Sequence, residues 1–65
     1  MDNSEEIVRR AQNLLDTWNR ENATLQEYYE ATRQLWALTS AKVLLNGGMY
    51  EIKNYAQGIV DRSRS

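Results

Sequence analysis

The sequence predicts an all-α fold. Its 65 residues include no Pro and only three Gly, so there are few points at which a helix must end. Apolar residues recur with a period near 3.6, and the alternating pattern of a half-buried strand is absent. We expect a single small helical domain over residues 1–61, followed by a disordered polar tail at residues 62–65.

The first helix is predicted over residues 4–21. Three good N-cap residues, Asp2, Asn3 and Ser4, stand at its start. Its apolar residues fall in one stripe about 120° wide, which predicts one packed face and one face in water. These residues are Ile7, Val8, Ala11, Leu14, Leu15 and Trp18.

A second helix is predicted over residues 25–46. Thr24 as N-cap and Glu27 three residues later form a capping-box sequence, and Gly47 is expected to provide a left-handed cap at the end. The connection to the first helix is short, which favours an antiparallel helical hairpin. The alternative is one unbroken helix through residues 19–24, because nothing there forbids it sterically.

The second helix carries an unusually wide apolar surface. Its apolar residues spread over an arc of roughly 200°, whereas a surface helix normally shows a stripe a little over 100° wide. One neighbouring helix cannot cover that arc, so we expect a third helix or a second chain to complete the fold. The arc comprises Leu25, Tyr28, Tyr29, Ala31, Leu35, Trp36, Leu38, Val43 and Leu45.

A shorter third helix is predicted over residues 49–60. Its apolar residues span an arc of about 140°. Gly58 costs about 1 kcal/mol relative to Ala inside a helix, so we expect the helix to fray or stop there. The apolar positions are Met49, Ile52, Tyr55, Ala56, Ile59 and Val60.

The composition argues against several classes of function. Eight Lys and Arg oppose nine Asp and Glu, and a net charge of −1 is a poor complement to nucleic acid. Because Cys and His are absent, we expect no disulfide, no metal site, no cofactor and no enzymatic activity. No apolar run approaches the ~20 residues of a transmembrane helix, and the first residues do not resemble a secretory signal, so we expect a cytoplasmic protein.

Aromatic residues are the main candidates for contact with a partner, because Trp and Tyr are enriched at interface hot spots. Trp36 lies near the middle of the wide arc, whereas Trp18 is expected to be mainly a core residue. Tyr28 and Tyr29 point about 100° apart, so they cannot serve one face equally. The candidate partner-binding residues are Tyr28, Tyr29, Trp36, Leu38, Val43, Leu45 and Tyr55.

The sequence therefore favours a non-enzymatic protein–protein interaction module. It would be a small helical regulator, adaptor or chaperone that buries an apolar helix face against a partner protein or a second copy, with a dimer as the favoured oligomer. A subunit of a larger assembly is a further possibility. None of these readings names the partner.

The alternative is a small dimeric DNA-binding regulator that reads bases with the third helix. That helix would present Tyr50, Lys53, Asn54 and Gln57. It holds one Lys and no Arg before position 62, which is a weak set of phosphate contacts. A helix-turn-helix usually has a small residue four positions before its turn glycine and an apolar residue six positions after it. This sequence does not have that pattern around Gly47 or around Gly48.

In layout alone, the chain resembles the small helical-hairpin chaperones of type III secretion needle subunits. The resemblance rests on a helix, a short turn and a second helix that opens with TLQEY at residues 24–28 and carries an apolar stretch at 41–45. It implies a chaperone that clasps a helical partner. Residues 47–60 would be an addition to that layout. Small phage or plasmid regulators have the same general layout. We assign no functional residue from either resemblance.

Overall fold

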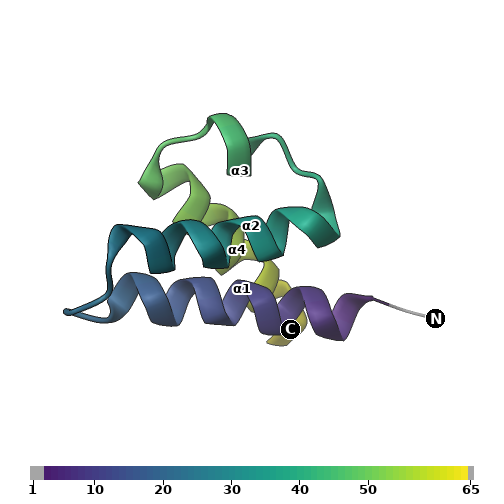
Figure 1. The fold of residues 1–65 in the computed structure, drawn as a ribbon. Coiled ribbons are helices and arrows are strands. Elements are labelled where there is room, and N and C mark those ends of the chain that lie inside the picture. Colours follow the sequence, from purple (N-terminus) through teal and green to yellow (C-terminus); the bar gives the residue numbers. More distant parts are fainter. Residues whose placement is uncertain (1–2, 65) are drawn as a thin grey trace.

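Four helices form the fold in a computed structural model that describes residues 3–64 (Figure 1). They are α1 (Ser4–Asn19), α2 (Leu25–Thr39), α3 (Val43–Asn46) and α4 (Met49–Arg64). No strand occurs among these described residues. The all-α prediction is confirmed.

The helix α1 is the central element of the packing. It packs against both α2 and α4. In Figure 1, α1 and α2 lie side by side and run in opposite directions, while α4 crosses behind them. The short α3 lies above α2 and contacts both α2 and α4. Beside α3, the α2 residues Tyr29 and Trp36 remain exposed.

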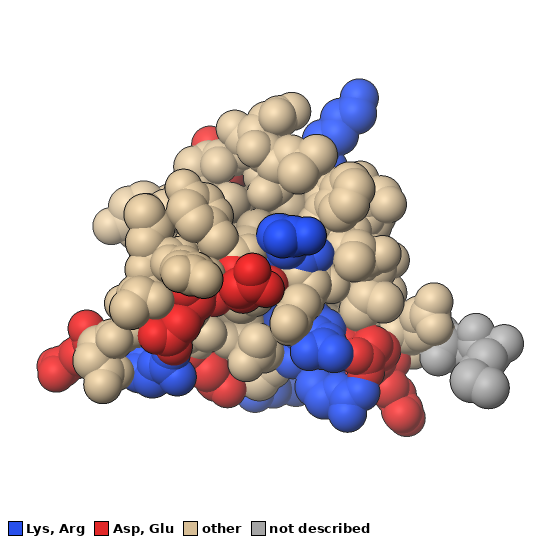
Figure 2. All heavy atoms as spheres, viewed as in Figure 1, with Lys and Arg blue, Asp and Glu red and all other residues tan. Residues whose placement is uncertain are grey.

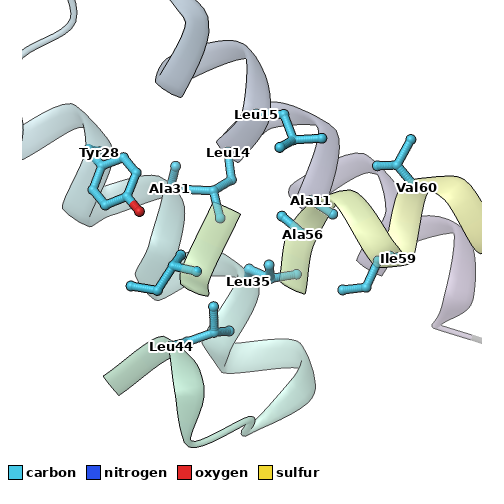
Figure 3. Close-up of a cluster of buried hydrophobic side chains, with 11 residues drawn as sticks. Ala11, Leu14, Leu15, Tyr28, Ala31, Leu35, Leu44, Ala56, Ile59 and Val60 are labelled. Atoms are coloured by element: carbon cyan, nitrogen blue, oxygen red, sulfur yellow. The ribbon is translucent and has the colours of Figure 1, made fainter. Parts of the chain in front are cut away.

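One apolar core joins all four helices. Leu14 from α1 and Leu35 from α2 are the largest side chains that are almost completely buried, with 1% and 0% of their surface exposed. Ala11, Ala31 and Ala56 let the helix backbones approach closely around them. Figure 3 shows these side chains pointing into a common interior. The remaining core residues are Leu15, Tyr28, Leu44, Ile52, Ile59 and Val60.

The second helix ends at Thr39 and not at residue 46 as the sequence predicted. Ser40 adopts a left-handed backbone conformation, with φ 55° and ψ 24°, and its N–H donates to the Trp36 carbonyl at 2.7 Å. The Thr39 hydroxyl accepts a bond from the Ala41 N–H at 3.3 Å, which offers the backbone an alternative to the helical ladder. The chain reverses there, and α3 places Leu44 in the core.

The predicted left-handed glycine cap is wrong. Gly47 follows α3 with an extended backbone, φ −78° and ψ 159°, and no glycine has a positive φ. A Cβ at this position would lie 2.6 Å from the Val43 carbonyl oxygen, so a close backbone approach, and not a left-handed conformation, explains the glycine.

The ends of the outer helices also differ from the prediction. α1 stops at Asn19, two residues short of the predicted end, and α4 continues past residue 60 to Arg64. Residues 62–64 are therefore helical and not a disordered tail, because the Ser63 hydroxyl bonds to the Val60 carbonyl at 2.6 Å and basic residues suit a helix C-terminus. Asp2 and Ser65 lie outside the described residues.

The capping box at the start of α2 is confirmed. The Thr24 hydroxyl accepts from the Glu27 N–H at 3.1 Å, and the Glu27 carboxylate accepts from the Thr24 N–H at 3.3 Å. Thr24→Ala removes the hydroxyl cap, so we expect it to lower the free energy of unfolding by about 1 kcal/mol. Urea denaturation followed by circular dichroism measures this change. Gln26→Ala, two residues further along the chain at an exposed position, is the control and should change stability by a few tenths of that amount.

Candidate partner-binding surface

Three of the predicted partner-binding residues line one groove between α2 and α3. Tyr29 and Trp36 come from α2, and Leu45 comes from α3. Their exposed fractions are 59%, 37% and 64%, which is high for large apolar side chains. The groove has a volume of about 220 Å³. The full lining of this α2–α3 groove is Tyr29, Thr32, Arg33, Trp36, Leu44 and Leu45.

The α2–α3 groove is apolar, with a single charge at its rim. Leu44, 4% exposed, anchors α3 to the core and places Leu45 at the surface. Thr32 is buried, but its hydroxyl donates to the Tyr28 carbonyl at 2.9 Å, so no polar atom in the floor lacks a partner. Arg33 is the only charged lining residue, and 81% of its side chain is exposed. The groove is suited to an apolar side chain with a nearby carboxylate.

Tyr28 belongs to the core and not to the contact surface. Only 5% of it is exposed, and its hydroxyl donates to the Met49 carbonyl at 3.4 Å. Burial raises the pKa of the Tyr28 hydroxyl, and neighbouring Tyr29 raises it further, while a hydrogen bond with Thr32 opposes the shift. Because the two adjacent tyrosines point about 100° apart, one ring lies in the core and the other lies at the surface.

The other three predicted residues lie away from the groove or partly inside the fold. Val43 is half-buried and packs against the core. Leu38 and Tyr55 are also half-buried and line a separate hollow of about 560 Å³ with Ile7 and Ile59. The seven predicted residues therefore do not form one surface.

A second apolar surface contains residues that the sequence reasoning did not select. Leu25, Met49 and Tyr50 expose 58%, 48% and 74% of their surface around the half-buried Trp18. Trp18, Leu25 and Met49 line a hollow of about 260 Å³, and the Tyr50 ring meets Trp18 edge to face at 5.6 Å. Leu25, which lies in the wide apolar arc, is the one residue of this surface that the sequence pattern could have indicated. We call these four residues the Trp18 patch.

The Trp18 patch and the α2–α3 groove share one edge of α2. Leu25 and Tyr29 are one helical turn apart, and Trp36 follows about two turns later. At 100° per residue, these three side chains fall within about 40° of one another. The Tyr29 ring also contacts the Tyr28 ring at 6.5 Å, which joins the two surfaces. The edge is therefore an exposed apolar stripe along α2.

Three of the four α4 residues predicted to face bases, Tyr50, Lys53 and Gln57, make contacts within the chain. The Lys53 ammonium lies 5.7 Å from the centre of the Trp18 ring, at cation–π distance. The Gln57 amide donates to the Asp61 carboxylate at 2.9 Å. In Figure 2, charged side chains gather along the side of α1, while the face over α2 and α3 is mostly uncharged.

Within residues 3–64, no group of three or more His, Cys, Asp or Glu is placed to hold a metal ion. None of the described helices has the length and apolar character needed to cross a membrane. Comparison of the chain with protein-family models, with curated proteins and with solved structures gives no match.

Proposed function

We propose that the protein is a non-enzymatic protein–protein interaction module, acting in the cytoplasm as a small regulator, adaptor or chaperone. The observation that carries this proposal is the α2–α3 groove, in which Tyr29, Trp36 and Leu45 stay exposed beside a core that is already closed. Aromatic residues at the edge of a hollow are the residue types that anchor protein interfaces.

The energetic scale supports a specific contact. Complete burial of a large apolar side chain contributes roughly 1.5–3 kcal/mol relative to exposure. Tyr29, Trp36 and Leu45 are already partly covered, so each offers a fraction of that value. Together with the exposed residues of the Trp18 patch, they can offset the loss of translational and rotational freedom on association.

Site-specific photo-crosslinking in living cells tests the proposal. We expect benzoylphenylalanine at position 29 to form covalent adducts with protein, because this side chain lies in the groove. The same probe at Asn13, which is exposed on α1, should form none. Adduct masses on denaturing gels and peptide sequencing identify the partner, and circular dichroism checks that both variants are folded.

A second substitution shows whether the adducts depend on the groove. Trp36→Glu places a carboxylate in the groove wall, so it should abolish adducts from position 29 without changing helicity. The proposal fails if position 29 gives no protein adduct, or if Asn13 gives the same adducts as position 29.

A further inference from the structure

We propose that the protein that covers the α2–α3 groove is a second copy of this chain, docked with α2 antiparallel to α2 around a two-fold axis. The inference rests on the proposed function and names its partner. It is drawn from the extent of the exposed apolar surface, from the order of residues along α2 and from the charges beside the stripe.

The exposed apolar surface approaches the size of one side of a standard protein interface, and neighbouring polar residues would supply the remainder. Among residues 3–64, six large apolar residues are exposed, and all belong to the α2–α3 groove or to the Trp18 patch. A fully exposed aromatic side chain offers about 150–250 Å², so the six offer on the order of 600 Å². A standard interface buries about 800 Å² per partner, and this chain has only 4781 Å² in all. The six are Leu25, Tyr29, Trp36, Leu45, Met49 and Tyr50.

The order of residues along α2 is self-complementary. A two-fold contact is isologous, so if one residue meets another, the reverse contact also forms. An axis midway between residues 29 and 36 places Tyr29 of each copy opposite Trp36 of the other. Two aromatic pairs then form at the centre of the interface, and aromatic pairs contribute beyond the area that they bury.

The charges beside the stripe fit the same axis. Arg33 and Glu30 both lie on the exposed side of α2, with 81% and 56% of their side chains exposed, and they form only a loose pair at 4.0 Å. Arg33 lies about 40–60° around the helix from Tyr29 and Trp36. Near the axis, Arg33 of one copy faces Arg33 of the other, and Glu30 of each copy lies beside these two arginines. The four charges form a cluster in which each Arg33 has a Glu30 of both copies within reach, so the carboxylates offset the repulsion between the arginines.

Electrostatic repulsion between copies is small. Each chain carries a net charge of −1, and the charged residues of α1 pair locally. Glu6 binds Arg9 and Arg10, and Arg20 binds Glu27 across the turn between α1 and α2. Arg33 and Glu30 are held together only at 4.0 Å, so both can turn toward the charges of a second copy.

Charge reversal with cross-mixing tests the dimer. Glu30→Arg gives a chain with two cations at this site, and Arg33→Glu gives one with two anions. Each variant alone should associate at least about tenfold more weakly than the wild type, because the four charges near the axis then all have the same sign. An equimolar mixture should recover wild-type association as a heterodimer. Sedimentation velocity at low salt, from low to high micromolar concentration, measures the mass.

Asp16→Arg is the matched control, since it makes the same charge change on the exposed side of α1. It should leave the dimer intact. The inference is overturned if the wild type is a dimer and both charge-reversal variants on α2 dimerise equally well, or if the mixture of the two variants stays monomeric. If the wild type is monomeric and position 29 crosslinks to a different protein, the inference falls while the proposed function stands. A monomer without any adduct at position 29 removes both.

Discussion

Leu35→Ala is expected to leave most molecules unfolded at room temperature. Leu35 has 0% of its surface exposed and lies in the core shared by the four helices. Truncation of such a leucine costs about 2–5 kcal/mol, through lost burial and the cavity left behind. A single core in a domain of fewer than about 70 residues rarely supplies more than 3–5 kcal/mol of stability. Far-UV circular dichroism with urea titration measures the loss of helicity and the free energy of unfolding.

Leu45→Ala is the matched control for that result, because it makes the same chemical change at a residue that is 64% exposed. It should leave the free energy of unfolding of the monomer nearly unchanged. If the groove binds a partner, the same substitution should weaken association. Equal destabilisation by the two substitutions would show that the core is not organised as the structure describes it.

Local patterns in the sequence were sufficient to predict the starts of α1, α2 and α4 and one cap. The period of 3.6 and the Thr24–Glu27 capping box are short-range signals, so the fold class and the start of α2 could be predicted. The break at Ser40 could not. Residues 39–42 contain no Gly or Pro, and a left-handed serine is unfavourable by itself. Tertiary packing of Leu44 offsets that cost, and such packing is not visible in the local sequence.

The candidate surface was partly predictable for a related reason. The wide apolar arc indicated that the predicted second helix needs cover on two sides, and Tyr29, Trp36 and Leu45 are the members of that arc, besides Leu25, that the structure leaves exposed. It cannot say which edge the rest of the chain covers, because α3 exists only once the helix breaks. Met49 and Tyr50 were missed because their exposure depends on how the first turn of α4 packs against the other helices, although the start of α4 at residue 49 was predicted.

Gly47→Ala is expected to destabilise the protein by about 1–3 kcal/mol through overpacking. A Cβ at this position would lie 2.6 Å from the Val43 carbonyl oxygen and 2.8 Å from its Cγ2, and the oxygen already accepts the Gly47 N–H. Since φ is −78°, the conformation itself suits any residue, so the penalty is steric. The backbone between α3 and α4 must shift, which disturbs the anchoring of Leu44.

Gly58→Ala is the matched control for Gly47→Ala, because it adds the same methyl group where there is space. The nearest atom outside the local backbone, Arg62 Nη1, lies 3.9 Å away, and the position is inside α4. Alanine there should raise the free energy of unfolding by about 0.5–1 kcal/mol. Urea denaturation of both variants should therefore give shifts of opposite sign. If Gly47→Ala were as stable as the wild type, the backbone between α3 and α4 could move to accommodate the methyl group at no cost. The groove wall formed by α3 would then not be a fixed surface.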